Sequence, residues 1–128
     1  MRAITRAFNK YYEKPNLNED TDTTMAQVEH IDEKTFEATL SKGKVLVDFS
    51  AQWCGPCRMM EPILDQLATD LDGEVTIAKI DVEEAQSTAL KYDVTTVPTL
   101  ILFQDGEVKG RMVGVKDLKA LKAFIETA

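Results

Sequence analysis

The sequence predicts an α/β protein in which a central mixed β-sheet carries helices on both faces. Apolar runs of strand length alternate with longer runs in which apolar residues recur at helical spacing, in the order β-α-β-α-β-α-β-β-α. At 128 residues the chain can bury one core without disulfide or metal staples. Its hydrophobic share of 44% and charged share of 29% are those of a soluble globular protein.

The first half of the predicted domain holds two strands and two helices. A short strand is expected at Val28, and Asp32 is a good N-cap for a helix that ends near Leu40. Residues 45–49 (VLVDF) form a strand too dense in apolar side chains to have a solvent face. The helix after them ends at residues 72–73. Its apolar face consists of Met60, Ile63, Leu64, Leu67, Ala68 and Leu71.

The second half adds three strands and two helices. In order, these are a strand at 75–81, a weaker helix at 84–91, strands at 99–103 and 107–113, and a helix from about Asp117. Asp105 and Gly106 indicate a hairpin between the last two strands. The last helix places Leu118, Leu121, Phe124 and Ile125 on one face.

Residues 1–24 differ in composition from the domain expected at 25–128. They are polar and contain a proline, which predicts a poorly ordered extension. The absence of an apolar region after the first basic residues argues against a secretory signal. An organelle transit peptide at 1–12 is a weaker alternative, because serine is absent and the following stretch is acidic. We favour a plain extension, or a true start at Met25, and expect a cytoplasmic protein.

The net charge of −7 argues against nucleic acid as a partner, because a polyanion would be repelled overall. No apolar run approaches the ~20 residues that a membrane span needs. We therefore expect neither nucleic acid nor a membrane as a partner, and we expect a monomer.

Cysteine occurs only twice, and both copies lie in residues 53–57 (WCGPC), between a predicted strand and a predicted helix. A bond between Cys54 and Cys57 would close so short a ring that it would stabilise the fold by only about 2 kcal/mol on the chain-entropy model. A pair that gains little from staying oxidised is suited to thiol–disulfide exchange. Half of a zinc site is disfavoured because His30 is the only histidine. Two inert core thiols rarely fall at this spacing.

The position of the pair assigns a role to each cysteine. Cys54 falls where the strand ends and the helix begins, so free N–H groups and the helix dipole should stabilise its thiolate, making it the attacking nucleophile. Cys57 lies one turn into the helix, should be more buried, and is the expected resolving thiol. Gly55 and Pro56 place no charge between the sulfurs, which favours a reductant over an oxidase.

Three further residues are candidates for the site. Asp48 interrupts an apolar strand, and a buried carboxyl that binds its proton tightly suits a proton acceptor for Cys57; the alternative is a solvated strand end. Lys79 interrupts a second strand and either pairs with Asp48 or is a solvated edge-strand lysine. Trp53, beside the nucleophile, is expected to be an exposed contact for a partner protein.

Residues 25–128 resemble the thioredoxin family over their whole length. The matching stretches are 45–57 (VLVDFSAQWCGPC), 58–62 (RMMEP), 78–83 (AKIDVE), 92–103 (YDVTTVPTLILF), 105–107 (DGE) and 113–114 (VG). The resemblance implies a thioredoxin fold, a cis peptide before Pro98 that faces the disulfide, and a buried proton-handling pair at Asp48 and Lys79. It also implies no bound cofactor beyond the redox-active disulfide, and a thioredoxin reductase that supplies electrons from NADPH or ferredoxin.

The same resemblance implies a surface for client proteins. Its residues are Trp53, Gly55, Pro56, Val82, Thr96, Val97, Pro98, Val113 and Gly114. Backbone groups at Thr96 and around Gly114 would take up an extended client segment. The chain departs from the family at Ser50, where many members carry an aromatic residue, and at Gln52, where an acidic residue is common. Both changes affect packing and charge around the active-site loop.

The predicted function is therefore that of a protein-disulfide reductase acting in cell redox homeostasis. One alternative is a binding subunit that uses the same surface without catalysis. Another is a disulfide oxidase or isomerase, which the missing secretory signal and the Gly-Pro spacer disfavour.

Overall fold

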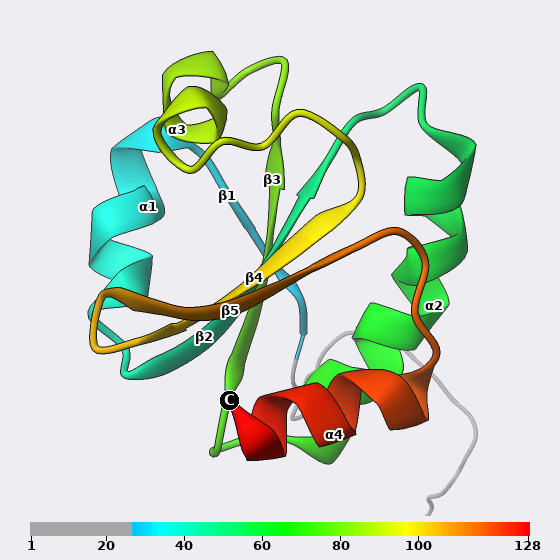
Figure 1. Ribbon diagram of the computed structural model, residues 1–128. Helices are drawn as coiled ribbons and strands as arrows, with labels where there is room; N and C mark the ends of the chain where they lie inside the picture. The colour runs from blue at the N-terminus through cyan, green and yellow to red at the C-terminus, as the bar shows by residue number, and fades with distance from the viewer. Residues whose placement is uncertain (1–26) are drawn as a thin grey trace, which may run out of the picture.

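The computed structural model of the protein describes residues 27–128, and its elements follow the predicted order (Figure 1). The strands are β1 (Glu29–Ile31), β2 (Lys44–Ser50), β3 (Thr76–Asp81), β4 (Thr99–Gln104) and β5 (Glu107–Val113). The helices are α1 (Glu33–Leu40), α2 (Gly55–Asp70), α3 (Gln86–Lys91) and α4 (Leu118–Thr127). The extension expected at 1–24, with the transit alternative at 1–12, lies outside the described residues.

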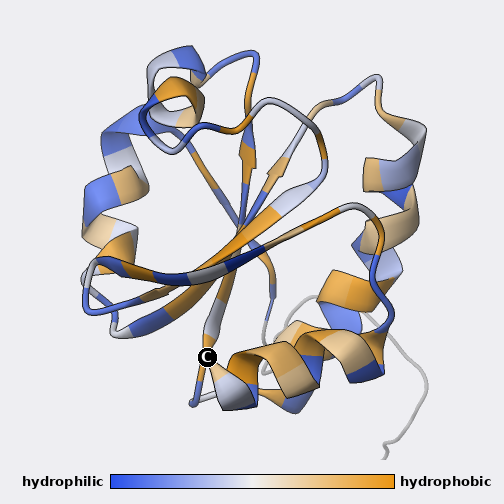
Figure 2. Cartoon of the chain, viewed as in Figure 1, coloured by the Kyte–Doolittle hydropathy of each residue, from blue (hydrophilic) through white to orange (hydrophobic). Residues whose placement is uncertain are grey.

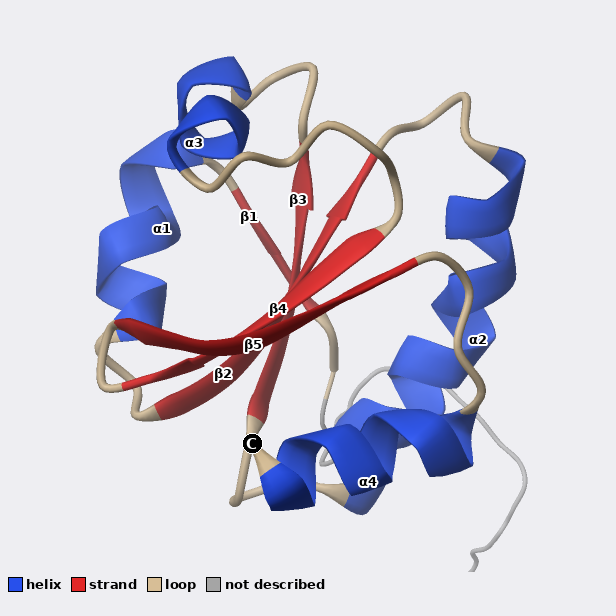
Figure 3. Ribbon diagram, viewed as in Figure 1, coloured by secondary structure: helices blue, strands red, loops and turns tan. Residues whose placement is uncertain are grey.

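The strands form one mixed sheet in the order β1-β3-β2-β4-β5. β1, β3 and β2 run parallel, whereas β4 is antiparallel to β2 and β5 is antiparallel to β4. Figure 3 shows α1 and α3 on one face of this sheet and α2 and α4 on the other. The predicted mixed sheet with helices on both faces is therefore confirmed.

Strand β2 lies at the centre of the sheet, and its side chains alternate between the two helical layers. Val45, Val47 and Phe49 join the core beneath α1, whereas Leu46 joins the core beneath α2 and α4. All three residues on the α1 side and Leu46 are fully buried, as predicted for a strand without a solvent face. The central strands accordingly contain much of the hydrophobic colour in Figure 2.

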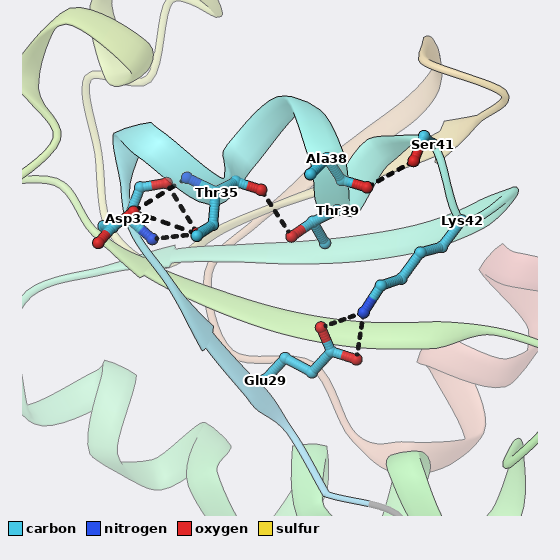
Figure 4. A network of polar contacts seen from close by, with 7 residues as sticks. All are labelled: Glu29, Asp32, Thr35, Ala38, Thr39, Ser41 and Lys42. Carbon is cyan, nitrogen blue, oxygen red and sulfur yellow. Dashed lines mark hydrogen bonds and ion pairs between the residues drawn. The ribbon is translucent and has the colours of Figure 1, made fainter.

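Polar contacts fix the first helix. The Asp32 carboxylate accepts a hydrogen bond from the Thr35 backbone N–H at 3.0 Å, and the Asp32 N–H donates to the Thr35 hydroxyl at 3.0 Å (Figure 4). This reciprocal capping box satisfies two N–H groups at the helix start. After α1, Lys42 forms an ion pair with Glu29 at 2.8 Å, which ties the helix exit to β1. The predicted N-cap at Asp32 is confirmed.

Some boundaries differ from the prediction. Val28 lies just before β1, because the strand pairing begins only at Glu29. Its side chain packs against the core beneath α2. Helix α3 begins at Gln86 and not at 84, since residues 82–84 form the turn after β3 and the Ala85 N–H donates to the Asp81 carbonyl. Within the described residues, no helix is long and apolar enough to cross a membrane.

The hairpin between β4 and β5 has the predicted turn chemistry. Asp105 and Gly106 have φ angles of 53° and 87°, the left-handed values that a two-residue hairpin turn of type I′ requires at both positions. This hairpin places the end of β5 beside the start of β4, where Thr99 and Val113 are register partners. Residues just outside the strands, at 97–98 and 114, are thereby brought together.

Candidate active site

The two cysteines form a disulfide where the chain leaves β2 and enters α2. Their Cα atoms are 5.2 Å apart, and Cys54 is the N-cap of the helix. The Cys57 backbone N–H donates to Cys54 Sγ at 3.1 Å, so a helix N–H group points at the sulfur that is predicted to become the thiolate. Both residues are nearly buried, with Cys57 at 1% exposure and Cys54 at 3%. The predicted difference in burial is present but small.

The segment before β4 covers the disulfide. The Val97–Pro98 peptide bond is cis, as the resemblance implied, and the Val97 carbonyl oxygen lies 3.9 Å from Cys54 Sγ. Pro98 is buried, and its carbonyl accepts a hydrogen bond from the Gly114 N–H at 2.9 Å. The Thr96 carbonyl accepts from the Thr99 hydroxyl at 2.5 Å. The loops before β4 and after β5 therefore form one unit against the cysteines.

The residues expected to contact clients differ in how accessible they are. Trp53 has 65% of its surface exposed and Val113 has 48%, while Gly55, Pro56 and Thr96 are also exposed. The remaining members, Val82, Val97, Pro98 and Gly114, are buried or half-buried. The expected exposure of Trp53 is confirmed.

Two features of this surface are not predicted by the sequence. The Trp53 indole N–H donates to a Glu83 carboxylate oxygen at 2.8 Å, which fixes the ring beside the disulfide. Met59, in the first turns of α2, is 63% exposed and adds an apolar side chain close to the cysteines. The sequence places Met59 next to the predicted apolar helix face, but no local signal connects Glu83 with Trp53, 30 residues earlier.

Asp48 is buried beneath α2 and is not a solvated strand end. Its residue exposure is 0%, and neither carboxylate oxygen has a hydrogen-bond partner among the described residues. Burial raises the pKa of Asp48 from its ordinary 3.8 to about 7; the nearby Lys79 charge opposes this rise and the Glu61 charge adds to it. The carboxyl can therefore take or release a proton near neutral pH.

Lys79 is not a solvated edge-strand lysine, and it does not form a hydrogen bond with Asp48. β3 lies between β1 and β2, so Lys79 is not on an edge strand. It is the register partner of Asp48, but its ammonium binds a Glu61 carboxylate oxygen at 2.8 Å and makes no hydrogen bond to Asp48. The Glu61 side chain is 54% exposed, so its charge keeps much of its hydration, whereas an ion pair with Asp48 would require full desolvation.

A groove of about 500 Å³ runs past Cys57 and this ion pair. Its lining includes His30, Ser50, Cys57, Arg58, Glu61 and Lys79. Ser50 is 2% exposed and lies on the same face of β2 as Asp48, so the aromatic residue common at this position in the family would project into the groove. Gln52 is exposed, and its carbonyl accepts a hydrogen bond from the Arg58 guanidinium at 2.9 Å.

Within the described residues, no group of three His, Cys, Asp or Glu side chains is arranged to hold a metal ion. The ligands required for the zinc alternative are therefore not assembled around Cys54 and Cys57 in this part of the chain. The arrangement instead combines a cysteine pair at a helix N-terminus with a buried carboxyl of raised pKa. These are the components that thiol–disulfide exchange needs.

The family model described as Thioredoxin matches residues 27–127. Thioredoxin from Chlamydia pneumoniae is 48% identical over 98 residues, which cover 77% of this chain and 95% of the relative. Thioredoxin from Staphylococcus saprophyticus is 45% identical over 96 residues, covering 75% and 92%. The solved structure of a mutant thioredoxin from Halobacterium salinarum NRC-1 has a TM-score of 0.71 and 41% identity, covering 82% of this chain and 95% of that one. The chain thus belongs to the thioredoxin family, and it is a thiol–disulfide oxidoreductase.

Proposed function

We propose that the chain reduces disulfides of client proteins in two successive exchanges, with Cys54 attacking and Cys57 resolving. The observation that carries this assignment is the Cys57 N–H aimed at Cys54 Sγ at 3.1 Å. A thiolate at Cys54 in the reduced protein would keep that donor and the positive end of the α2 dipole. Both favour the charged form at Cys54 over Cys57, which lies within the helix.

In the first exchange, the Cys54 thiolate attacks one sulfur of the client disulfide. A bond forms between Cys54 and that sulfur, and the other client sulfur leaves as a thiolate that takes a proton from solvent. The cis Val97–Pro98 segment, 3.9 Å from Cys54 Sγ, forms one wall of the attack site. We place the approaching client on the surface that carries Trp53 and Val113, because both side chains are apolar and exposed.

In the second exchange, Asp48 accepts the proton of the Cys57 thiol. The Cys57 thiolate attacks Cys54 Sγ, the client's second sulfur leaves as a thiolate, and the Cys54–Cys57 disulfide forms. Two electrons thereby pass from the cysteine pair to the client. A pKa of about 7 places Asp48 close to the best value for a base that works at neutral pH. Lys79 influences this step through its charge rather than through a bond to Asp48.

The surface that binds clients consists of Trp53, Gly55, Pro56, Val82, Thr96, Val97, Pro98, Val113 and Gly114. Trp53 and Val113 contribute exposed apolar side chains to this surface, and the Gly114 N–H to Pro98 carbonyl hydrogen bond joins the loops at 96–98 and 114. Such a surface binds an extended backbone with little demand on client sequence. It fits a reductase with several clients.

The oxidised pair requires an electron donor, and we assign this role to a thioredoxin reductase that draws on NADPH or ferredoxin. The disulfide itself is the redox group, and no further cofactor enters the proposed cycle. We also expect the protein to act as a cytoplasmic monomer.

Reduction of insulin disulfides in the presence of dithiothreitol tests the proposal. The full chain should accelerate reduction, and Cys54→Ser and Cys57→Ser should each abolish the acceleration. The two variants should differ in a trapping experiment, because only Cys57→Ser retains the attacking thiol and should accumulate a mixed disulfide with insulin. Accumulation in Cys54→Ser instead would reverse the assigned roles. No acceleration by the natural chain itself would leave only the binding-subunit alternative, and full acceleration by the double variant would show that the cysteines do not carry the activity.

A further inference from the structure

Three polar side chains form a row across the sheet beneath α2. His30 on β1 and Asp48 on β2 are both register partners of Lys79 on β3, so the three residues lie side by side on adjacent strands. Glu61 on α2 lies above this row, and the groove beside Cys57 is lined by His30, Glu61 and Lys79 together. Lys79 is thus flanked by two carboxylates, one buried and one at the surface.

The lysine is bound to only one of them. Lys79 Nζ lies 2.8 Å from Glu61 Oε2, while both oxygens of Asp48 lack a hydrogen-bond partner among residues 27–128. The Lys79 side chain is 18% exposed and lines the groove. Because a lysine stem is long and flexible, the same side chain could turn toward its strand neighbour if nothing held it outward.

We propose that Glu61 is a positioning residue that holds the Lys79 ammonium at the protein surface and so leaves Asp48 unpaired. The inference rests on the proposed function in one respect, because an unpaired Asp48 matters only if Asp48 is the base for Cys57. The ion pair with Glu61 keeps the positive charge near enough to moderate Asp48 but not to bond with it.

Other charged groups around Asp48 do not replace Glu61 in this role. On α2, the Arg58 guanidinium is engaged with the Gln52 carbonyl at 2.9 Å, and Cys57 is neutral in the disulfide. On β4, the register partner of Asp48 is Leu100, which is apolar. On β1, His30 is separated from Asp48 by β3. Lys79 and Glu61 are the two groups whose charges act on the Asp48 pKa.

Loss of Glu61 would release Lys79 toward Asp48. An opposite charge within bonding reach of a carboxylate lowers its pKa by about 1–3 units, so Asp48 would become a weaker base and would remain ionised at lower pH. The direct loss of the Glu61 charge acts in the same direction. A double-variant comparison separates the two effects, because only the effect through Lys79 disappears when Lys79 is absent.

The test is a carboxyl-carbon NMR titration of Asp48 in the full-length oxidised protein and in the variants Glu61→Ala, Lys79→Met and Glu61→Ala/Lys79→Met. We expect Glu61→Ala to lower the Asp48 titration midpoint by about one unit or more. In the Lys79→Met background the same change should produce less than half of that shift. Asp70→Ala is the matched control, because it breaks an ion pair of the same helix with Lys122 at 2.7 Å and should leave the midpoint unchanged.

An unchanged Asp48 midpoint in Glu61→Ala would overturn the inference. So would a Glu61→Ala shift in the Lys79→Met background that is at least half of the shift in the natural chain. The rate of the Cys57 step against pH then separates this result from the proposed function. If the midpoint moves and the rate profile moves with it, both hold. If the midpoint moves while the rate profile stays, the role of Glu61 stands and Asp48 is not the base.

Discussion

Burial of Asp48 lowers the stability of the fold, because no described hydrogen bond replaces the water that its carboxyl loses. A buried carboxyl is normally paired or hydrogen-bonded, and among residues 27–128 neither oxygen of Asp48 has such a partner. Burial raises the Asp48 pKa to about 7, so the carboxyl stays protonated and uncharged in mildly acidic solution. The same environment that lowers stability gives the residue a proton affinity useful at neutral pH.

The variant Asp48→Asn should lose the pH dependence of stability that the raised Asp48 pKa causes. Because the Asp48 pKa is higher in the native protein than in the unfolded chain, the native state binds the proton more tightly and stability falls as the pH rises from about 4 to about 7. A shift from 3.8 to about 7 corresponds to a loss on the order of 4 kcal/mol. The neutral amide cannot ionise, so the stability of the variant relative to the natural chain should rise over that pH range by about this amount.

Urea unfolding of the oxidised proteins at several pH values between 4 and 8 measures this difference. Asp72→Asn serves as a control, because it makes the same chemical change at an exposed position after α2. A constant offset between Asp48→Asn and the natural chain across the whole range would show that Asp48 does not titrate with a raised pKa.

The contact partners of charged side chains are the part of the site that the sequence does not predict. The burial of Asp48 follows from its place inside an apolar strand, and that inference needs only local pattern. The partner of Lys79 depends on which residue of α2 lies above β3, and this follows from helix rotation over the sheet. The Glu61 contact, 18 residues from Lys79, therefore has no sequence signal, and neither has the bond from Trp53 to Glu83.

Helix α2 connects the site to the rest of the fold. Cys54 takes the N-cap position that Ser, Thr, Asp or Asn usually occupies, and its sulfur accepts the helix N–H that those side chains would bind. The helix continues from there through Pro62 to Asp70 and buries Met60, Leu64 and Leu67 against the sheet. The packing of the far turns thus holds the first turn, and with it the disulfide, in place.

Periodicity predicts the helices well and their ends less well. The apolar spacing of α2 and α4 spans several turns, so a few ambiguous residues do not change the assignment. α3 has only six residues, and its N-cap Ala85 makes no side-chain hydrogen bond, so the sequence carries no sharp signal for its start. β1 is shorter still, and its position is decided by pairing with β3.

The packing of α4 leads to a prediction for Leu121→Ala. Leu121 is fully buried in the core shared with α2, and truncation there leaves a cavity, which should lower the free energy of unfolding by about 2–5 kcal/mol. The same substitution at Leu90, which is 78% exposed on α3, should change it by about 0.5 kcal/mol or less. Denaturant unfolding of both oxidised variants checks the contrast. Equal losses would mean that α4 does not pack as described.

At the scale of the whole molecule, the sheet directions explain why the site lies at one edge. β2 and β3 run parallel, so their carboxyl ends carry Cys54 and Val82 to the same edge. β4 runs antiparallel to β2, which brings its first residues, and Pro98 before them, to that edge as well. β5 reverses again and delivers Gly114 beside Pro98. Four segments distant in sequence therefore meet without any long loop (Figure 1).

All the contacts described above join residues within 27–128, and we therefore make a prediction for a chain that begins at Met25. Because every contact described at the site lies within the sheet, its helices and the loops that join them, removal of residues 1–24 should change the rate of insulin reduction by less than about twofold and should leave the denaturation midpoint unchanged. Side-by-side assays of the full and shortened proteins test the domain boundary. A large loss of stability or activity would show that residues 1–24 belong to the functional domain.

The redox poise of the whole protein depends on how strongly it stabilises the Cys54 thiolate. Gly55 and Pro56 contribute no charge between the sulfurs, and the helix N–H and dipole act on Cys54 without a cation in the spacer. At equilibrium with glutathione at pH 7, the pair should therefore be more reducing than the glutathione couple. Pro56→His should move the equilibrium toward easier reduction, because a cationic imidazole stabilises the thiolate and hence the reduced form. A natural pair that is already strongly oxidising, with no further change in Pro56→His, would identify the protein as an oxidase instead.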